Sequence, residues 1–234
     1  MRSKEISYIT NQLNNILNTK FLQLKETISE VSKNTKSGNI TINSNKKVFN
    51  FDKIADMVYN GNSKPKSVDM IHIQNNIIYL IEFKDVLIFR EDKEDKEDKE
   101  DKEDKEDKED KEDKEDKEDK EDKEDKEDKE DKEDKEDKED IKSNIKLKSI
   151  ESLIILHKLL ENLNINFSKI IDLNIYYYIV CKENINLEQN ALNRSRVYNN
   201  AMLANIPHYK NTYFKDIKIS SFKSFEKDFI LKYF

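Results

Sequence analysis

The stretch KSVDMIHIQNNIIYLIEFKDVLIF, residues 66–89, decides the fold that we expect for this chain. Its apolar residues predict one strand from Val68 to Ile73 and a second from Ile77 to Lys84. The Gln74-Asn75-Asn76 segment between them suits a tight turn, because asparagine tolerates a positive φ. The two strands are therefore predicted to form a β-hairpin. The second strand is so apolar that both of its faces should be covered.

Charged side chains interrupt this apolar hairpin. Because side chains alternate along a strand, Glu82 and Lys84 point to the same side, and Asp69 on the preceding strand can reach that side. Ionised groups in a buried strand are costly unless they are paired or bound to a metal. Two carboxylates and an ammonium on one sheet face would suit a hard cation such as Mg²⁺. The structural alternative is an ordinary salt bridge among these three groups at the edge of the sheet.

Periodic patterns on either side of the hairpin predict an α/β fold in three layers, with a mixed central sheet flanked by helices. Ser3 can cap a first helix whose apolar stripe runs from Ile6 to Val31. The remaining expected elements are extended segments at Asn39–Asn43 and Lys47–Phe51, a short amphipathic piece at Phe51–Asn60, a helix at Ile145–Leu163, a strand at Leu173–Cys181, a weaker helix at Leu187–Asn199, a strand at Tyr213–Ile219 and a closing helix at Ser224–Phe234.

A low-complexity arm, Glu91–Asp140, divides the chain into two segments. It repeats EDK and holds 17 Glu, 17 Asp and 16 Lys, a formal charge of −18. Removing these 34 acids and 16 lysines from the 50 acidic and 43 basic residues of the chain leaves a body with a charge of +11. Without an apolar residue the arm cannot build a core, so we expect a disordered segment or an isolated helix. Residues 1–90 and 141–234 are then expected to form one discontinuous domain.

Composition excludes several classes of protein. The single Cys181 rules out a disulfide framework and a cysteine-rich zinc site, and three His are too few for a His-based metal cluster. The first residues lack the apolar core of a secretory signal, and no apolar run approaches the roughly 18 residues that span a membrane. We therefore expect a soluble, intracellular protein without a membrane partner.

The order of these residues resembles the PD-(D/E)XK nuclease superfamily. Asp69 and then Glu82-Phe83-Lys84 lie on consecutive predicted strands, after an N-terminal helix and before a helix and a strand. The resemblance covers Ser3 to Cys181 without the arm. It implies a restriction-endonuclease-like α-β-β-β-α-β core. The sequence departs from the superfamily pattern in having no Pro directly before Asp69, and no QxxxY motif follows in the next helix.

The resemblance also implies a metal-dependent nuclease activity. Asp69 and Glu82 would bind Mg²⁺ or Mn²⁺, the Phe83 carbonyl could be a further ligand, and Lys84 would orient or activate the attacking water. The substrate would be nucleic acid, with DNA favoured over RNA. Many restriction-type relatives dimerise, which leaves a homodimer open. Two other hypotheses are a catalytically inactive nucleic-acid-binding or interaction module of the same fold, and a scaffold whose acidic arm is the functional part.

Weaker signals concern basic and aromatic residues outside the hairpin. Lys146 and Lys148 open the helix after the arm, where they would contact phosphate or lie on a solvated face. Arg194 and Arg196 would contact a nucleic-acid backbone or belong to ordinary surface. The packing alternative is preferred for His157, Cys181 and the three tyrosines Tyr176, Tyr177 and Tyr178.

The arm generates the first testable prediction. Loop closure costs only about 0.6 kcal/mol per doubling of loop length, so replacing Glu91–Asp140 with a short Gly/Ser linker should leave the free energy of unfolding nearly unchanged in urea denaturation. Because the arm carries −18 and the body +11, the shortened protein should bind nucleic acid more tightly at low salt, with the difference shrinking as salt screens the charges. Equal affinities at low salt would make the arm a passive expansion, and loss of folding would make it structural.

Overall fold

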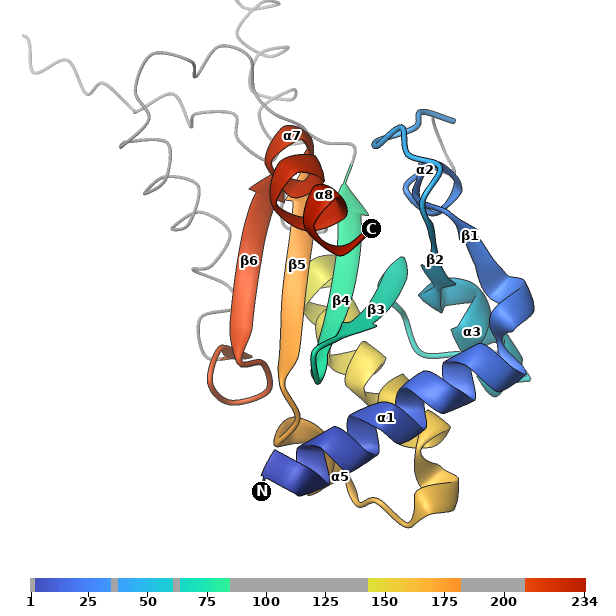
Figure 1. Ribbon diagram of the computed structural model, residues 1–234, viewed down its shortest axis with the longest axis vertical. Helices are drawn as coiled ribbons and strands as arrows, with labels where there is room; N and C mark the ends of the chain where they lie inside the picture. The colour runs from blue at the N-terminus through green and yellow to red at the C-terminus, as the bar shows by residue number, and fades with distance from the viewer. Residues whose placement is uncertain (1–2, 35–37, 61–63, 85–142, 182–208) are drawn as a thin grey trace, which may run out of the picture. The chain divides into compact units, whose positions relative to one another are not determined.

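The computed structural model describes residues 3–34, 38–60, 64–84, 143–181 and 209–234. Their centre is one six-stranded mixed sheet in which the strands lie in chain order (Figure 1). Neighbours are antiparallel from the first to the fourth strand, and the last three strands are parallel. The strands are β1 (Lys25–Thr27), β2 (Lys47–Asn50), β3 (Met70–Gln74), β4 (Ile77–Lys84), β5 (Ile175–Cys181) and β6 (Asp216–Ser221). The predicted α/β class with a mixed sheet is confirmed.

The predicted hairpin forms between β3 and β4. Asn75 and Asn76 both have positive φ angles, 51° and 61°, as a two-residue hairpin turn requires. Pairing begins at Gln74 with Ile77 and extends to Met70 with Ile81. The first strand of the hairpin therefore begins two residues later than the predicted Val68, and Asp69 lies just before it.

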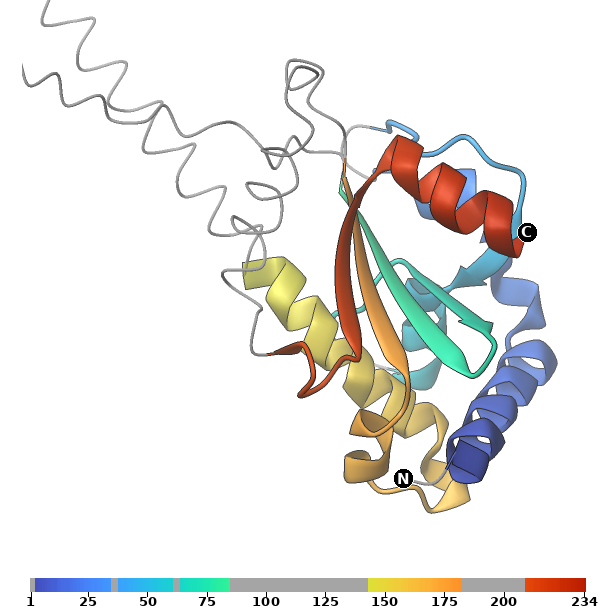
Figure 2. The same ribbon diagram turned by 60° about the vertical axis from the view of Figure 1, so that its left-hand side comes forward.

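Helices cover both faces of the sheet (Figures 1 and 2). Residues 143–159 form a helix on one face, which agrees with the apolar pattern of Ile145–Leu163. The opposite face is covered by a continuous helical run at the C-terminus, made of α7 (Phe222–Phe225), η5 (Glu226–Ile230) and α8 (Leu231–Tyr233). The helices on the two faces and the sheet between them make the three layers expected from the sequence.

Alternation along β4 assigns its side chains to these two layers. Ile81 and Phe83 belong to a buried cluster with Phe225 and Phe229 of the C-terminal run. Glu82 lies between them in the strand and therefore points to the other face, toward the helix of residues 143–159. One strand thus contributes both to an apolar core and to a charged layer.

The N-terminal segment corrects one prediction. The apolar stripe from Ile6 to Val31 is not a single helix, because α1 (Ser3–Lys20) ends before Phe21. A 3₁₀ turn, η1 (Leu22–Leu24), leads into β1 and then into the short α2 (Ile28–Val31). Thr27 and Glu30 explain the new helix start: the Thr27 hydroxyl accepts the Glu30 N–H, and the Glu30 carboxylate accepts the Thr27 N–H at 2.8 Å.

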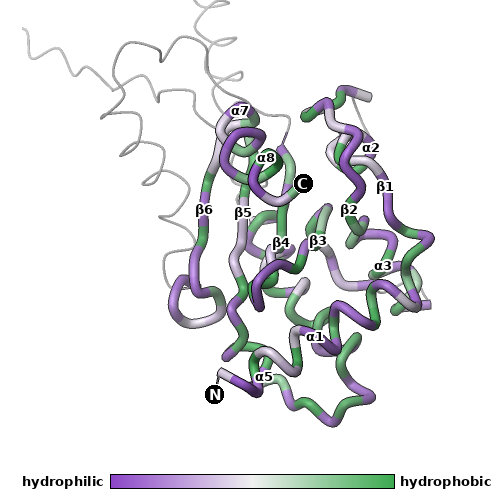
Figure 3. Tube along the Cα trace, viewed as in Figure 1, coloured by the Kyte–Doolittle hydropathy of each residue, from purple (hydrophilic) through white to green (hydrophobic). Residues whose placement is uncertain are grey.

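The remaining helix α1 keeps the predicted amphipathic pattern. Hydrophobic and hydrophilic residues alternate around it in Figure 3. Its buried side chains include Ile9, Leu13 and Leu17, spaced four apart on one face. It lies on the same side of the sheet as the C-terminal helices, near the end where β5 begins (Figures 1 and 2).

Smaller elements depart from the predictions in limited ways. Asn39–Asn43 forms no strand and contributes only a bridge between Ile40 and Lys33. A short helix that the sequence did not indicate, α5 (Phe167–Ile171), is capped by Asn166, whose side chain accepts the Lys169 N–H. The further described elements are α3 (Phe51–Val58), as expected, and the 3₁₀ turn η2 (Glu161–Leu163). The arm and the predicted helix Leu187–Asn199 lie outside the described residues. None of the described helices combines the length and apolarity needed to cross a membrane.

The hairpin turn gives a stability prediction. Asn76→Val should lower the free energy of unfolding by about 1–2 kcal/mol, because a β-branched residue is strained at φ 61°. Asn76→Gly should be neutral or stabilising. Both are measured by urea denaturation, with Asn45→Val, an exposed position whose φ is not positive, as the matched control. An Asn76→Val variant as stable as the control would show that the turn does not hold this conformation.

Candidate active site

Two carboxylates meet beside the end of β4. The hairpin register, continued one step past Met70 and Ile81, places Asp69 opposite Glu82 on the same face of the sheet. Asp69 Oδ2 accepts the Phe83 backbone N–H at 2.6 Å, which holds its carboxylate against β4. Glu82 has no exposed surface, and 23% of the Asp69 side chain is exposed. The pair thus joins one fully buried acid to one that opens to solvent.

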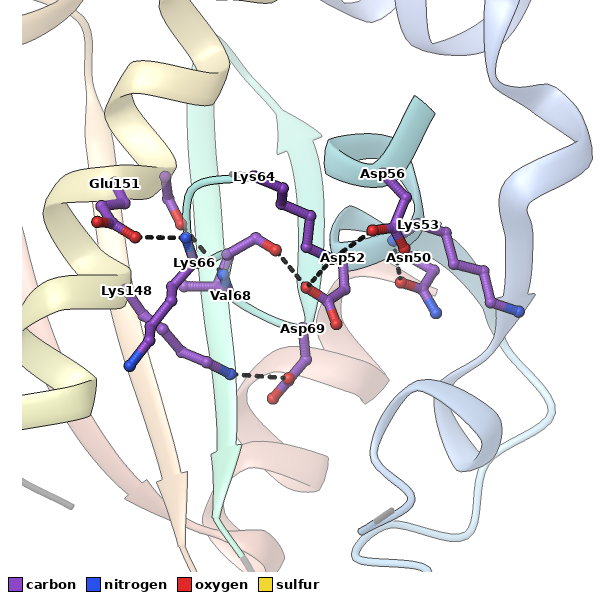
Figure 4. A network of polar contacts seen from close by, with 12 residues as sticks. Asn50, Asp52, Lys53, Asp56, Lys64, Lys66, Val68, Asp69, Lys148 and Glu151 are labelled. Carbon is purple, nitrogen blue, oxygen red and sulfur yellow. Dashed lines mark hydrogen bonds and ion pairs between the residues drawn. The ribbon is translucent and has the colours of Figure 1, made fainter. Parts of the chain in front are cut away.

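Lys148 bridges these carboxylates from the helix of residues 143–159. Its Nζ lies 2.8 and 3.0 Å from the two oxygens of Glu82 and 3.5 Å from Asp69 Oδ1. Figure 4 shows the side chain extending from the helix toward Asp69. One ammonium therefore contacts carboxylate oxygens from two neighbouring strand segments. Neither of the two alternatives predicted for Lys148, a phosphate contact or a solvated face, anticipated this position.

Lys84 adds a second ammonium to the same group. Its Nζ lies 2.7 Å from Glu82 Oε1, the oxygen that Lys148 also contacts. The structure thus brings the three residues Asp69, Glu82 and Lys84 together, and Lys148 joins them. Two carboxylates and two ammonium groups balance in formal charge. This balance satisfies the requirement that a charge buried like that of Glu82 be paired.

The pKa of the Asp69 carboxyl is raised to about 7, chiefly because burial disfavours its charged form and next because the Glu82 carboxylate lies nearby. The Lys148 ammonium, the Phe83 N–H and the Lys84 ammonium oppose this rise. The pKa of the Lys148 ammonium is itself raised: burial lowers it, but the carboxylates of Glu82 and Asp69 outweigh the burial. Lys148 therefore stays charged at neutral pH, whereas Asp69 is close to its midpoint.

Polar contacts position the segment that leads into Asp69 (Figure 4). The Val68 N–H, which a continued β-ladder would direct to the Phe83 carbonyl, donates instead to Ser152 Oγ at 3.1 Å. The Ser67 hydroxyl donates to Asp52 at the start of α3. Figure 4 shows this network running from the helix of residues 143–159 across to α3. The ladder ends here because the Val68 N–H turns to a side chain of the helix of residues 143–159, while the Ser67 side chain holds the adjacent residue to α3.

Asp52 lies at the outer end of this network. Lys64 bridges it to Asp56 on the next turn of α3, at 3.3 and 2.6 Å from the two carboxylates. The charge of Asp52 also raises the pKa of Lys148, after the effects of Glu82 and Asp69. The acid is more than half exposed. A third carboxylate therefore influences the site without belonging to the buried pair.

The donor set fits a hard divalent cation. Asp69 and Glu82 offer carboxylate oxygens on one face of the sheet. In a strand, the N–H and the C=O of one residue point to the same neighbouring strand. Because the Phe83 N–H donates to Asp69, the Phe83 carbonyl faces the Asp69 side as well. Burial, with the nearby Glu82 charge, raises the pKa of Asp69 even though two ammonium groups lie beside the acids. No group of three or more His, Cys, Asp or Glu side chains that could hold a metal occurs among the described residues.

Lys148 is the member of the site that the sequence analysis assigned to other roles. It follows Ile145 by three residues and precedes Ser152 by four, and both of those side chains are buried. This spacing places Lys148 on the sheet-facing side of its helix. The helical phase, taken with an unpaired acid on the facing strand, is the signal that could have identified it.

Lys146, the neighbour of Lys148 that was predicted with it, contacts an aromatic ring. Lys146 Nζ lies 5.8 Å from the centre of the Tyr209 ring. Arg194 and Arg196 lie outside the described residues. Cys181 and Tyr177 are fully buried, and Tyr177 donates to the Ile145 carbonyl at 3.2 Å, so both pack in the core as expected.

His157 and the other two tyrosines also make packing contacts. The His157 ring lies 5.7 Å from Phe167 in an edge-on contact and is half-buried rather than fully enclosed. Tyr176 and Tyr178 pack against the apolar cluster beneath the C-terminal helices. These contacts agree with the packing alternative preferred for all three residues.

Comparison with known proteins adds no relative. No protein-family model, curated protein or solved structure matches this chain. The resemblance to the PD-(D/E)XK superfamily therefore stays a prediction that depends on the residues described above.

The raised pKa of Asp69 gives a prediction about pH. Between about pH 4, the usual carboxyl pKa, and about 7, folded Asp69 holds a proton that the unfolded chain has lost, so the free energy of unfolding should fall as the pH rises through this window. Asp69→Asn removes this titration. Relative to this variant, the wild type should lose about 1 kcal/mol or more between pH 4 and 7, since one pKa unit corresponds to about 1.4 kcal/mol.

The measurement is urea denaturation of both proteins at half-unit steps from pH 4 to 8. The control is Asp56→Asn, which removes an exposed acid of α3 that pairs with Lys64. The effect assigned to Asp69 is the pH-dependent change in the free energy of unfolding that exceeds the change seen with this control. A stability difference that stays constant, or that grows in favour of the wild type with rising pH, would contradict the assignment of a raised pKa to Asp69.

Proposed function

We propose that this protein is a Mg²⁺- or Mn²⁺-dependent nuclease that hydrolyses phosphodiester bonds of DNA, with RNA as the alternative substrate. The observation that carries the proposal is the convergence of Asp69 and Glu82 on one sheet face with Lys84 beside them. Two acids and a lysine in this arrangement match the chemistry that the resemblance implies. The burial of Glu82 supports the proposal further, because burying a carboxylate destabilises the fold, and packing alone would not require an acid at this position.

The residues of the site divide into metal ligands and a group that orients water and stabilises charge. Asp69, Glu82 and the Phe83 carbonyl would hold the metal. The metal, when bound, would lower the pKa of a coordinated water and neutralise charge developing on the phosphate. Lys84, whose ammonium reaches the Glu82 oxygen at 2.7 Å, would orient the attacking water by a hydrogen bond and stabilise negative charge on the phosphate.

The charge of the body supports a nucleic-acid substrate. Outside the arm the chain has 27 Lys and Arg against 16 Asp and Glu. A surplus of this size attracts phosphate backbones, and binding of that kind weakens as salt rises. A nuclease needs this electrostatic attraction for substrate capture, so the surplus and the paired acids suit the same function.

A second candidate function is a catalytically inactive module that binds nucleic acid or another partner. The position of Lys148 favours it, because one ammonium contacts both carboxylates and pairs them without a metal. In that case the four charged groups would serve only to hold the hairpin and the helix of residues 143–159 together. The two candidates differ in whether the site binds a divalent cation and cleaves a phosphodiester.

A cleavage assay tests the proposal. Wild-type protein should cut DNA when Mg²⁺ or Mn²⁺ is added and not in the presence of a chelator. Asp69→Asn and Glu82→Gln should abolish cleavage, and Lys84→Ala should slow it about 10²-fold or more, the usual effect of removing one donor that stabilises charge in the transition state. Circular dichroism should show that each variant keeps the fold.

Matched controls separate the site from general charge effects. Asp56→Asn and Lys20→Ala change an exposed acid on α3 and an exposed base at the end of α1, and both should cleave as the wild type does. Cleavage at the wild-type rate by Asp69→Asn or Glu82→Gln would make the nuclease assignment wrong. Salt-sensitive DNA binding without cleavage in any metal would favour the inactive module.

A further inference from the structure

Lys148 occupies the position of a cation between the two acids. Its ammonium contacts both oxygens of Glu82, at 2.8 and 3.0 Å, and Asp69 Oδ1 at 3.5 Å. These are the same carboxylate groups that would bind a divalent ion. Because the Lys148 ammonium fills the space between the acids that a bridging metal would need, the lysine and the metal compete for that position.

The two lysines of the site differ in this respect. Lys84 belongs to the same strand as Glu82, and the acid with which its ammonium pairs among the described residues is Glu82, at Oε1. Lys148 comes from a separate helix and reaches both acids. Lys148 is therefore the ammonium that occupies the bridging position which a cation shared by Asp69 and Glu82 would need.

The exposed fractions of the Glu82 and Lys148 side chains indicate which of the two can move when a metal binds. Glu82 has no exposed surface and lies within β4, so its carboxylate is held by the sheet. The Lys148 side chain is 22% exposed, and its ammonium is joined to the helix by a flexible four-carbon chain. The acid Asp52, which is more than half exposed and already acts on the Lys148 charge, offers a direction for the displaced ammonium.

We propose that Lys148 is an intramolecular competitor for the divalent metal, a built-in counter-ion that holds Asp69 and Glu82 paired until the metal displaces its ammonium. This inference rests on the proposed function, because it concerns the same metal site. The lysine keeps the buried acids neutralised in the metal-free protein, and the metal affinity of the site is lower by the cost of removing it.

Metal binding measures this competition directly. Mn²⁺ is titrated calorimetrically into the full-length wild type, Lys148→Met and the control Lys146→Met, which changes a lysine of the same helix that contacts Tyr209 instead of the acids. Lys148→Met should bind Mn²⁺ about tenfold more tightly or better, because a neighbouring unit charge changes the ion affinity of a carboxylate by one or more factors of ten. Lys146→Met should bind as the wild type does.

A measurement on the unaltered protein covers the case in which Lys148→Met does not fold. Ammonium groups held in ion pairs are observed by nitrogen-15 NMR of lysine side chains, and the Lys148 signal is assigned by its loss in Lys148→Arg. Saturating Mg²⁺ should shift this signal or remove it. The Lys148 signal remaining unchanged while Mg²⁺ binds would overturn the inference.

The outcomes separate the two proposals. Mn²⁺ binding by the wild type with equal or weaker binding by Lys148→Met overturns the competition and leaves the metal site in place. Absence of Mn²⁺ binding in every folded variant overturns the proposed nuclease and the competition together. Tighter binding by Lys148→Met, without cleavage of any nucleic acid by any of the proteins, supports the competition and rejects the nuclease activity.

Discussion

The buried charge of Glu82 is the constraint on which the arrangement of this protein depends. Its carboxylate lies within the central sheet without exposed surface, in a strand whose neighbours are almost all apolar. Such a charge is stable only with close partners of opposite sign. Lys84 and Lys148 supply them at 2.7 and 2.8 Å. The strand, the hairpin and the facing helix therefore need one relative placement in which these groups meet.

This pairing joins parts of the chain that are far apart in sequence. Glu82 and Lys148 are 66 residues apart, and the arm lies between them. The helix of residues 143–159 is attached to β4 by this ion pair and to the segment before β3 by the Ser152 hydroxyl, which accepts the Val68 N–H. The Tyr177 hydroxyl, which donates to the Ile145 carbonyl, attaches the same helix to β5. Directional contacts of this kind select the orientation of the helix, which burial of apolar area alone does not specify.

The two faces of β4 make different kinds of contact. The face under the C-terminal helices is an aromatic cluster in which Tyr79 contacts Phe229 and Tyr233 at ring distances of 5.0 and 5.4 Å. His72 belongs to this cluster, and burial lowers its pKa to about 4, so its ring is neutral at physiological pH. The opposite face carries the charged pairs. Aromatic packing under the C-terminal helices stabilises β4, whereas burying charged groups on its opposite face lowers its stability.

The sequence by itself determined the hairpin, its turn and the face shared by Glu82 and Lys84, because these follow from residue periodicity and from asparagine at positive φ. Local patterns also identified the helix after the arm and the strand Ile175–Cys181. They failed between Phe21 and Val31, where a stripe compatible with one long helix gives way to a 3₁₀ turn and β1, and the capping box of Thr27 and Glu30 then starts a new helix. The apolar spacing of a long stripe fits one helix or several shorter elements, and only the packed structure decides between them.

Tertiary structure alone decided that Lys148 joins Lys84 in neutralising the acids. Asp69 and Glu82 could be identified from their strands, but Lys148 belongs to another element, and its helical phase does not say which acid it meets. The raised pKa of Asp69 has the same origin, since it depends on burial and on the distance to Glu82. Charge interactions act through space and fall off with distance rather than with separation along the chain. The sequence therefore determined which residues carry charge, and the fold decided which charges meet.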